Sequence, residues 1–208
     1  MTQLQFAITG AAPKPRAASP AISFGLSIAS NERIEALVLR AEVRIEPQWR
    51  EYTGREKPLL NDLFGTPERW GQTLRTFSWA DVPVMVTAFD EQTQATIDVP
   101  CTYDFDVAAT RFLHAVNEGE IPLRFFFSGA IFTYGGNGLS TERVAWSSEA
   151  SYRMPEQVWR DALHAVYGDD ALIRVSAQTL ERLHALRSLS GAVSWDDLFA
   201  RLASETVQ

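Results

Sequence analysis

Three aspartates in one alternating stretch are the residues of this sequence whose types and spacing best fit a catalytic or metal-binding site. Asp98, Asp104 and Asp106 occupy even positions between Ala95 and Val107, where the odd positions are mostly apolar. Even positions of a strand share one face, and next neighbours on that face stand about 6.6 Å apart. Such carboxylates could bind a hard cation or act as an acid and base pair, so a metal-dependent enzyme is one hypothesis. Ordinary outward charges on a strand are the other.

The remaining residues with reactive side chains are scattered. His114, His164 and His184 fall on three different predicted helices, without the HxxxH or HExxH spacing that fixes a metal site. Cys101, the single cysteine, points inward by the alternation and has no neighbouring histidine, so we expect a buried, unreactive thiol. We therefore predict no catalytic residue, no metal ligand and no cofactor, and we expect a protein that is not an enzyme.

Composition limits the classes of partner. The chain has 208 residues, of which 46% are apolar, so it can form one domain, or one domain with a small appendage, around a sizeable core. Its net charge of −7 argues against nucleic-acid and anionic-membrane partners, which bind basic surfaces. A single cysteine and an N-terminus without a basic, then apolar, leader predict a soluble, cytoplasmic protein.

A second group of residues favours binding. The alternation stops between Pro47 and Trp79, and short helices are expected there, over 58–64 and from Thr66 to about Arg75. This insertion is rich in Trp, Tyr and Arg, the residue types that carry binding energy at protein interfaces. Its aromatic residues either cap an open end of the core or form a partner surface. The second hypothesis assigns partner binding to Trp49, Arg50, Tyr52, Arg55, Arg69, Trp70 and Arg75.

The elements that position these residues are mainly strands. Alternating apolar residues predict about seven, near 4–8, 22–28, 37–45, 82–88, 95–107, 121–134 and 139–147. The second and third look like a hairpin, and a helix is expected between Asp106 as N-cap and Gly119 as its stop. The predicted fold is α+β and mainly β: an antiparallel, immunoglobulin-like β-sandwich with a C-terminal helical appendage.

The division expected is a sandwich domain over residues 1–150, with the insertion at 47–79, and a helical appendage over 151–208 packed on it. Within the appendage, Pro155 is expected at the start of one helix, Ser176 as N-cap of the next, and Ser194 as N-cap of the last. The leucine stripe Leu180, Leu183, Leu186 and Leu189 is interpreted as core.

The last forty residues resemble a ribbon-helix-helix module in the stretch ALIRVSAQTLERLHALRSLSGAVSWDDLFARL. That resemblance implies DNA binding, with Arg174 as the strand side chain that reads bases. Four arginines and four acidic residues balance in this segment, which argues against a phosphate-binding face.

Two wider resemblances concern most of the chain. The stretches VPCTYDFDVAATRFLHAVNEGEIPLRFFFSGAIFTY, VAWSSEASYRMPEQVWRDAL and IRVSAQTLERLHALR resemble an uncharacterised bacterial family of about 200 residues, from about Pro20 onward. The family is found near nickel–iron hydrogenase genes, which implies an accessory or maturation role and transfers no catalytic residue. Paired alternating strands followed by Gly129, Ala130, Ile131 and Phe132 also resemble SecB-type chaperones, and imply a surface for apolar segments.

We therefore expect a non-catalytic, protein-binding accessory or assembly factor, whose partner would be a hydrogenase subunit or maturation factor. A SecB-like holdase, a metal-dependent enzyme and a DNA-binding protein are the alternatives. No nucleic acid and no membrane is expected as partner, and a homo-oligomer is compatible with the sequence.

Overall fold

The computed structural model describes residues 2–102, 104, 107–135 and 138–206, and it divides into two units, Met1–Ala171 and Leu172–Gln208. The division therefore lies after the helix that follows the last strand, beyond the boundary expected at residue 150. Among the described helices, none combines the length and the apolar character needed to cross a membrane.

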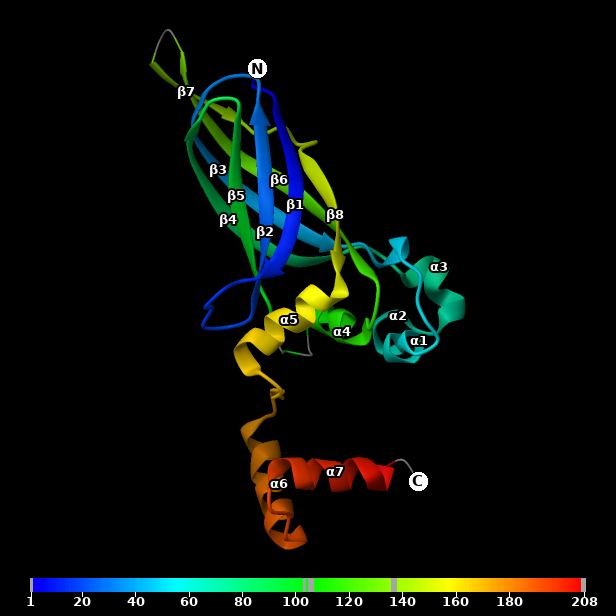
Figure 1. The fold of residues 1–208 in the computed structure, drawn as a ribbon. Coiled ribbons are helices and arrows are strands. Elements are labelled where there is room, and N and C mark those ends of the chain that lie inside the picture. The colour runs from blue at the N-terminus through cyan, green and yellow to red at the C-terminus, as the bar shows by residue number, and fades with distance from the viewer. Residues whose placement is uncertain (1, 103, 105–106, 136–137, 207–208) are drawn as a thin grey trace. The chain divides into compact units, whose positions relative to one another are not determined.

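The first unit contains two antiparallel sheets that lie face to face (Figure 1). One sheet has the order β1-β2-β5, and the other has the order β4-β3-β6-β7, with β8 also paired to β6. The predicted antiparallel, mainly β fold is confirmed. The strands are β1 (Leu4–Pro13), β2 (Ala21–Ser30), β3 (Ile34–Ile45), β4 (Phe77–Phe89), β5 (Gln92–Pro100), β6 (Glu120–Gly135), β7 (Gly138–Arg143) and β8 (Glu149–Pro155).

The core lies between the sheets, where each strand presents every second side chain. Ile22, Phe24 and Leu26 of β2 are fully buried, and Phe24 packs edge-on against Phe125 of β6 at 5.2 Å between ring centroids. β6 is interior, as its apolar residues on both faces predicted, because β3 pairs along one side of it and β7 and β8 along the other. Period-two burial is thus the property that builds this unit.

The predicted hairpin of β2 and β3 is wrong. β2 pairs with β1 and β5, whereas β3 pairs with β4 and β6, so residues 31–33 carry the chain from one sheet to the other. Two strands that face each other across a core alternate in the same way as two strands of a hairpin. The alternation therefore could not distinguish the two arrangements.

The stretch expected as one long strand over 95–107 ends early. Ile97, Val99 and Cys101 are buried as the alternation predicted, but β5 stops at Pro100, and Tyr103 and Phe105 lie outside the described residues. The helix that follows, α4 (Ala108–Ala115), is shorter than expected. Its predicted N-cap, Asp106, lies outside the described residues.

α4 ends before the predicted stop at Gly119 because its last turn is held from outside. Val116 is fully buried in an extended conformation, and the Asn117 N–H donates to Oε1 of Glu56 at 2.9 Å. A further helical turn would break both interactions.

The insertion forms short helices, as predicted, though in more pieces. These are η1 (Pro47–Trp49), α1 (Glu56–Leu59), α2 (Asn61–Phe64), η2 (Pro67–Arg69) and α3 (Trp70–Thr73), and the predicted insertion overlaps the start of β4 at Phe77. Figure 1 shows α1 to α4 and α5 (Glu156–Tyr167) at one end of the sandwich. Leu60, Phe64 and Trp70 are buried there, so part of the insertion closes the core.

Two helices make up the second unit, α6 (Ala177–Ser190) and α7 (Trp195–Thr206). The expected N-caps are confirmed: Oγ of Ser176 accepts from the Thr179 N–H at 3.1 Å, and Oγ of Ser194 accepts from the Asp197 N–H at 3.0 Å. The leucine stripe of α6 is not core, because α6 has no buried residue among those described.

Candidate functional site

A buried ion pair anchors the start of the insertion. Nη2 of Arg50 donates to Oε1 of Glu56 at 2.9 Å, and the side chains are 6% and 0% exposed. Glu56 also accepts from the N–H groups of Thr53 and Asn117, each at 2.9 Å. Burial acts to raise the pKa of Glu56, but these hydrogen bonds and the charge of Arg50 outweigh burial, so its pKa lies below the ordinary value.

Arg50 and Tyr52 hold the loop around this pair. Arg50 donates to the carbonyl oxygens of Glu51 and Glu118, each at 3.1 Å, and its guanidinium lies 4.9 Å from the centre of the Tyr52 ring. The Tyr52 hydroxyl donates to the Pro47 carbonyl at 2.7 Å, and burial raises the pKa of that hydroxyl. Both side chains point into the fold, so their contacts hold the surrounding loop in place.

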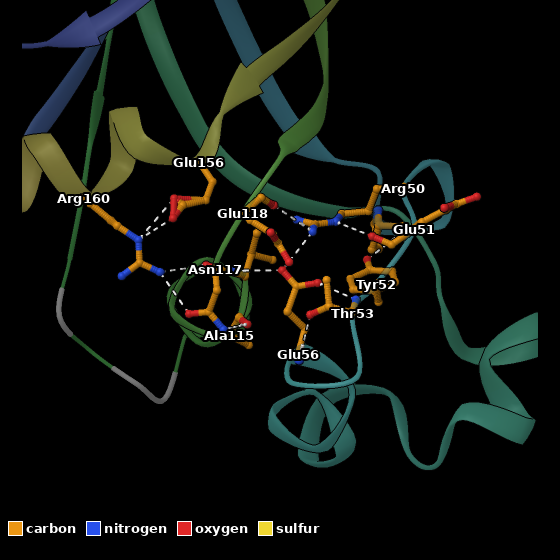
Figure 2. A network of polar contacts seen from close by, with 12 residues as sticks. Arg50, Glu51, Tyr52, Thr53, Glu56, Ala115, Asn117, Glu118, Glu156 and Arg160 are labelled. Carbon is orange, nitrogen blue, oxygen red and sulfur yellow. Dashed lines mark hydrogen bonds and ion pairs between the residues drawn. The ribbon is translucent and has the colours of Figure 1, made fainter.

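The same network reaches α5 (Figure 2). Arg160 pairs with Glu156, whose side chain is buried, and Nη2 of Arg160 donates to the Val116 carbonyl at 3.2 Å and to Oδ1 of Asn117 at 3.0 Å. Asn117 therefore connects the insertion with α5. Three segments far apart in the sequence are fixed to one another by charge-assisted hydrogen bonds, which are stronger than neutral ones.

Trp49, the last residue of η1, directly precedes Arg50 of this network and is exposed. The residue is 60% exposed, and its carbonyl accepts from Nη2 of Arg153 on β8 at 3.3 Å. Two hollows, of about 620 and 360 Å³, share Trp49 and Arg153 as lining residues. We call this surface the Trp49 groove; its lining residues are Glu46, Gln48, Trp49, Arg50, Glu51, Thr53, Glu118, Gly119, Glu120, Pro122, Leu123, Arg124, Ser151, Tyr152 and Arg153.

The charges of the Trp49 groove are not all neutralised. Arg124 pairs with Glu46 at 3.4 Å and with Glu149 at 3.0 Å. Glu51, Glu118 and Glu120 are exposed at the rim of the larger hollow, and their carboxylates form no ion pair within the described part of the chain. The groove thus offers an aromatic face, one exposed arginine and an acidic rim.

The residues predicted to bind a partner divide into two sets. Arg50, Tyr52 and Trp70 are internal: the Trp70 Nε1–H donates to the Gly65 carbonyl at 2.8 Å, and its ring packs edge-on against Tyr52 at 5.0 Å. Trp49, Arg55, Arg69 and Arg75 are exposed, but only Trp49 lines the groove. Arg75 lines a separate hollow of about 550 Å³ with Trp70.

Sequence reasoning missed the β8 contribution. Arg153 belongs to a strand whose inward residues are Ala150, Tyr152 and Met154, an alternation that is present in the sequence but only seven residues long. Glu118 and Glu120, which lie just before β6 and at its first residue, give no such signal, because nothing local indicates that they lie beside Trp49.

Of the three aspartates, the structure describes Asp98 and Asp104, and of these two only Asp98 lies on the strand. Asp98 lies on β5, where Lys14 donates to Oδ2 at 2.7 Å and Ser23 donates to Oδ1 at 2.6 Å. Asp104 follows the end of the strand, and Asp106 lies outside the described residues. Across the described ranges, no group of three His, Cys, Asp or Glu side chains is arranged to hold a metal ion.

The other candidate residues are also apart. His114, His164 and His184 lie on α4, α5 and α6, as predicted. Cys101 is buried, and burial raises the pKa of its thiol to about 12, which leaves it protonated at neutral pH. Arg174 lies in a segment without strand structure, so the described chain lacks the strand of a ribbon-helix-helix module.

Comparison with known proteins places the chain in a family but does not indicate an activity. A model described as a family of unknown function (DUF6084) matches residues 1–208, and none of the curated proteins matches the chain. A β-glucosidase from Kluyveromyces marxianus is 8% identical with a TM-score of 0.28, over 74% of this chain and 15% of that one. The β-glucosidase 3B from Thermotoga neapolitana in complex with alpha-D-glucose is 9% identical with a TM-score of 0.26, over 73% of this chain and 17% of that one. The chain spans less than a fifth of these enzymes, and similarity this low indicates nothing about its activity.

Proposed function

Because the chain belongs to this family of unknown function, we propose a function from its surface: a non-catalytic accessory or assembly factor that binds a segment of another protein in the Trp49 groove. One observation carries the proposal. Trp49 is 60% exposed between two hollows, at the end of η1 and directly before Arg50, whose buried ion pair with Glu56 holds the chain in place there.

The exposed area of Trp49 is large enough to matter for affinity. A fully exposed tryptophan offers about 250 Å², so about 150 Å² of Trp49 remains to be covered. At about 25 cal/mol per Å², its burial would contribute up to about 4 kcal/mol. Tryptophans at the centre of protein interfaces cost about 2 kcal/mol or more when they are truncated, which agrees with this figure.

A fixed loop also lowers the cost of binding. Ordering a mobile side chain on association costs about 0.5–1.5 kcal/mol, and ordering a loop costs more. Here the Glu56 carboxylate accepts hydrogen bonds from Arg50, Thr53 and Asn117, which hold residues 50–56 in place before any partner binds. The groove therefore has the preorganised character of a recognition surface.

The charges of the groove indicate the chemistry of the partner. An acidic rim of Glu51, Glu118 and Glu120 beside an exposed indole favours a segment that carries lysine or arginine next to an apolar side chain. Binding at such a rim weakens with salt, because exposed charges are screened beyond about 8 Å at physiological ionic strength.

The resemblance to a family found near nickel–iron hydrogenase genes makes a cytoplasmic hydrogenase subunit or maturation factor the first partner to test. A pull-down from native lysate of a hydrogenase-producing cell checks this. We expect wild type and Trp146→Ala to recover the same stoichiometric partner and Trp49→Ala to lose it. Trp146 is the matched control, since it is 95% exposed and lines neither hollow of the groove.

Trp70→Ala is not a clean variant for this purpose, because Trp70 is buried and its loss would disturb the fold. Equal recovery by Trp49→Ala and wild type would remove the groove as the contact. Suppression of aggregation of unrelated unfolded proteins, without a stoichiometric partner, would instead support the SecB-like holdase.

A further inference from the structure

The second unit has almost no core of its own. Its described helices are α6 and α7, and two helices bury only a small part of their surface against each other. Ala192 and Leu198 are its buried apolar residues within the described part of the chain. Two packed helices with so little interior need a further surface to cover them.

The apolar residues left uncovered are concentrated in this unit. Half of the large apolar side chains that are exposed in the described chain belong to it, although it holds less than a fifth of the residues. They are Leu172, Ile173, Val175, Leu180, Leu186, Leu189, Val193 and Phe199. Concentrations of this kind mark interaction surfaces, whereas single exposed apolar residues do not.

The two helices of the unit carry opposite charge. Residues 172–190, which include α6, hold three arginines against one glutamate, whereas residues 194–208, which include α7, hold three acidic residues against one arginine. The unit as a whole is neutral, so the net charge of −7 resides in the first unit. Two copies of the chain repel each other through their first units and not through their second units.

This distribution is self-complementary. A two-fold axis brings the same patch of both copies together, so each residue contact occurs twice. With α6 of one copy against α7 of the other, the basic helix meets the acidic helix in both halves of the contact, and the exposed leucines of α6 lose their contact with water.

We propose that the occupant of this apolar surface is a second copy of the chain, so that the protein is a two-fold dimer held by its C-terminal helices. The dimer would present two Trp49 grooves, one on each first unit, and would bind a partner that has two matching segments more tightly than one that has a single segment.

Sedimentation velocity of the full chain over a range of concentrations tests the proposal. We expect wild type to sediment as a dimer of the 23.2 kDa chain, and Leu186→Asp combined with Leu189→Asp to sediment as a monomer with an unchanged far-UV spectrum. Leu139→Asp is the control and should remain dimeric, because Leu139 is an exposed leucine on β7 of the first unit, with an exposed fraction of 60% that lies between those of Leu186 and Leu189.

A second variant tests the charge pattern without altering the apolar surface. Arg182 is exposed on α6, so Arg182→Glu lowers the positive charge of α6 and should weaken the dimer about ten-fold, with a smaller loss at high salt. A wild-type monomer at 100 μM, or a dimer that survives the double leucine variant, would overturn the proposal. A monomer with these leucines protected from exchange would show that the chain's own first unit or another protein covers them instead.

Discussion

Replacing Glu56 by glutamine should strongly destabilise the first unit, because Glu56 is a buried carboxylate paired with a buried arginine. The side chain is fully buried, and its two oxygens accept from Arg50, Asn117 and Thr53. A glutamine amide has one oxygen, so at least one of these donors would face an NH₂ group. The Arg50 guanidinium, which is 6% exposed, would keep its charge without the carboxylate that balances it.

The size of the loss follows from these contacts. Breaking a buried ion pair by removing one partner costs about 3–5 kcal/mol, because an uncompensated charge stays in the interior. For a domain of this size, about 3 kcal/mol corresponds to a fall in Tm of roughly 6–12 °C. We expect Glu56→Gln to lower the free energy of unfolding by about 3–5 kcal/mol.

Urea unfolding followed by tryptophan fluorescence measures the loss, with Glu149→Gln as the control. Glu149 pairs with Arg124 at 3.0 Å, but its side chain is 45% exposed, and exposed pairs contribute about 0–1 kcal/mol. Equal losses of unfolding free energy in the two variants would refute the reasoning that the buried Arg50–Glu56 pair holds the segment next to Trp49 in place.

Three further outcomes follow from the same structure. The folded-state pKa of Glu56 lies below its ordinary value of 4.5, so its contribution to stability is present above that pH and is lost as the pH falls through the lowered value. An acid titration of unfolding free energy should therefore fall more steeply below pH 4.5 for wild type than for Glu56→Gln, and parallel curves would contradict this. Cys101 is buried with a pKa of about 12, so a thiol reagent should modify it only as fast as the chain unfolds, whereas rapid modification of native protein would show an open site. Gly129→Ala should cost more than about 3 kcal/mol or abolish folding, because Gly129 has φ 146° and an added Cβ would lie 2.0 Å from the Val38 carbonyl oxygen. Gly71→Ala, with nothing within 4 Å of the added atom, is the control that should be close to neutral in the same unfolding measurement.

Much of the fold could be predicted from the sequence because burial alternates along its strands. Ile22, Phe24 and Leu26 on β2, and Ile97 and Val99 on β5, are buried as their spacing predicts. Alternation does not specify the partner of a strand, however, which is why the predicted pairing of β2 with β3 is wrong.

For the candidate site, the sequence predicts which residue types are present but not which of them are exposed or which residues they contact. Tryptophan and arginine mark the insertion as unusual, but a sequence does not say which tryptophan faces water: Trp49 is exposed and Trp70 is buried. Glu56 has local partners in Arg50 and Thr53, but its third partner, Asn117, is 61 residues away in the chain. Contacts at that distance follow from the topology of the sheets and not from local pattern.

The most direct test of the binding role is the affinity of the captured partner for Trp49→Ala and for Trp146→Ala, measured by isothermal titration calorimetry. Removing about 2–4 kcal/mol of contact corresponds to a loss of roughly 30-fold to several hundred-fold in affinity. We expect a loss of that size for Trp49→Ala and a change of less than about two-fold for Trp146→Ala, which is 95% exposed outside the groove. Affinities for the two variants that agree with each other and with wild type would contradict the central claim that the Trp49 groove is the binding surface.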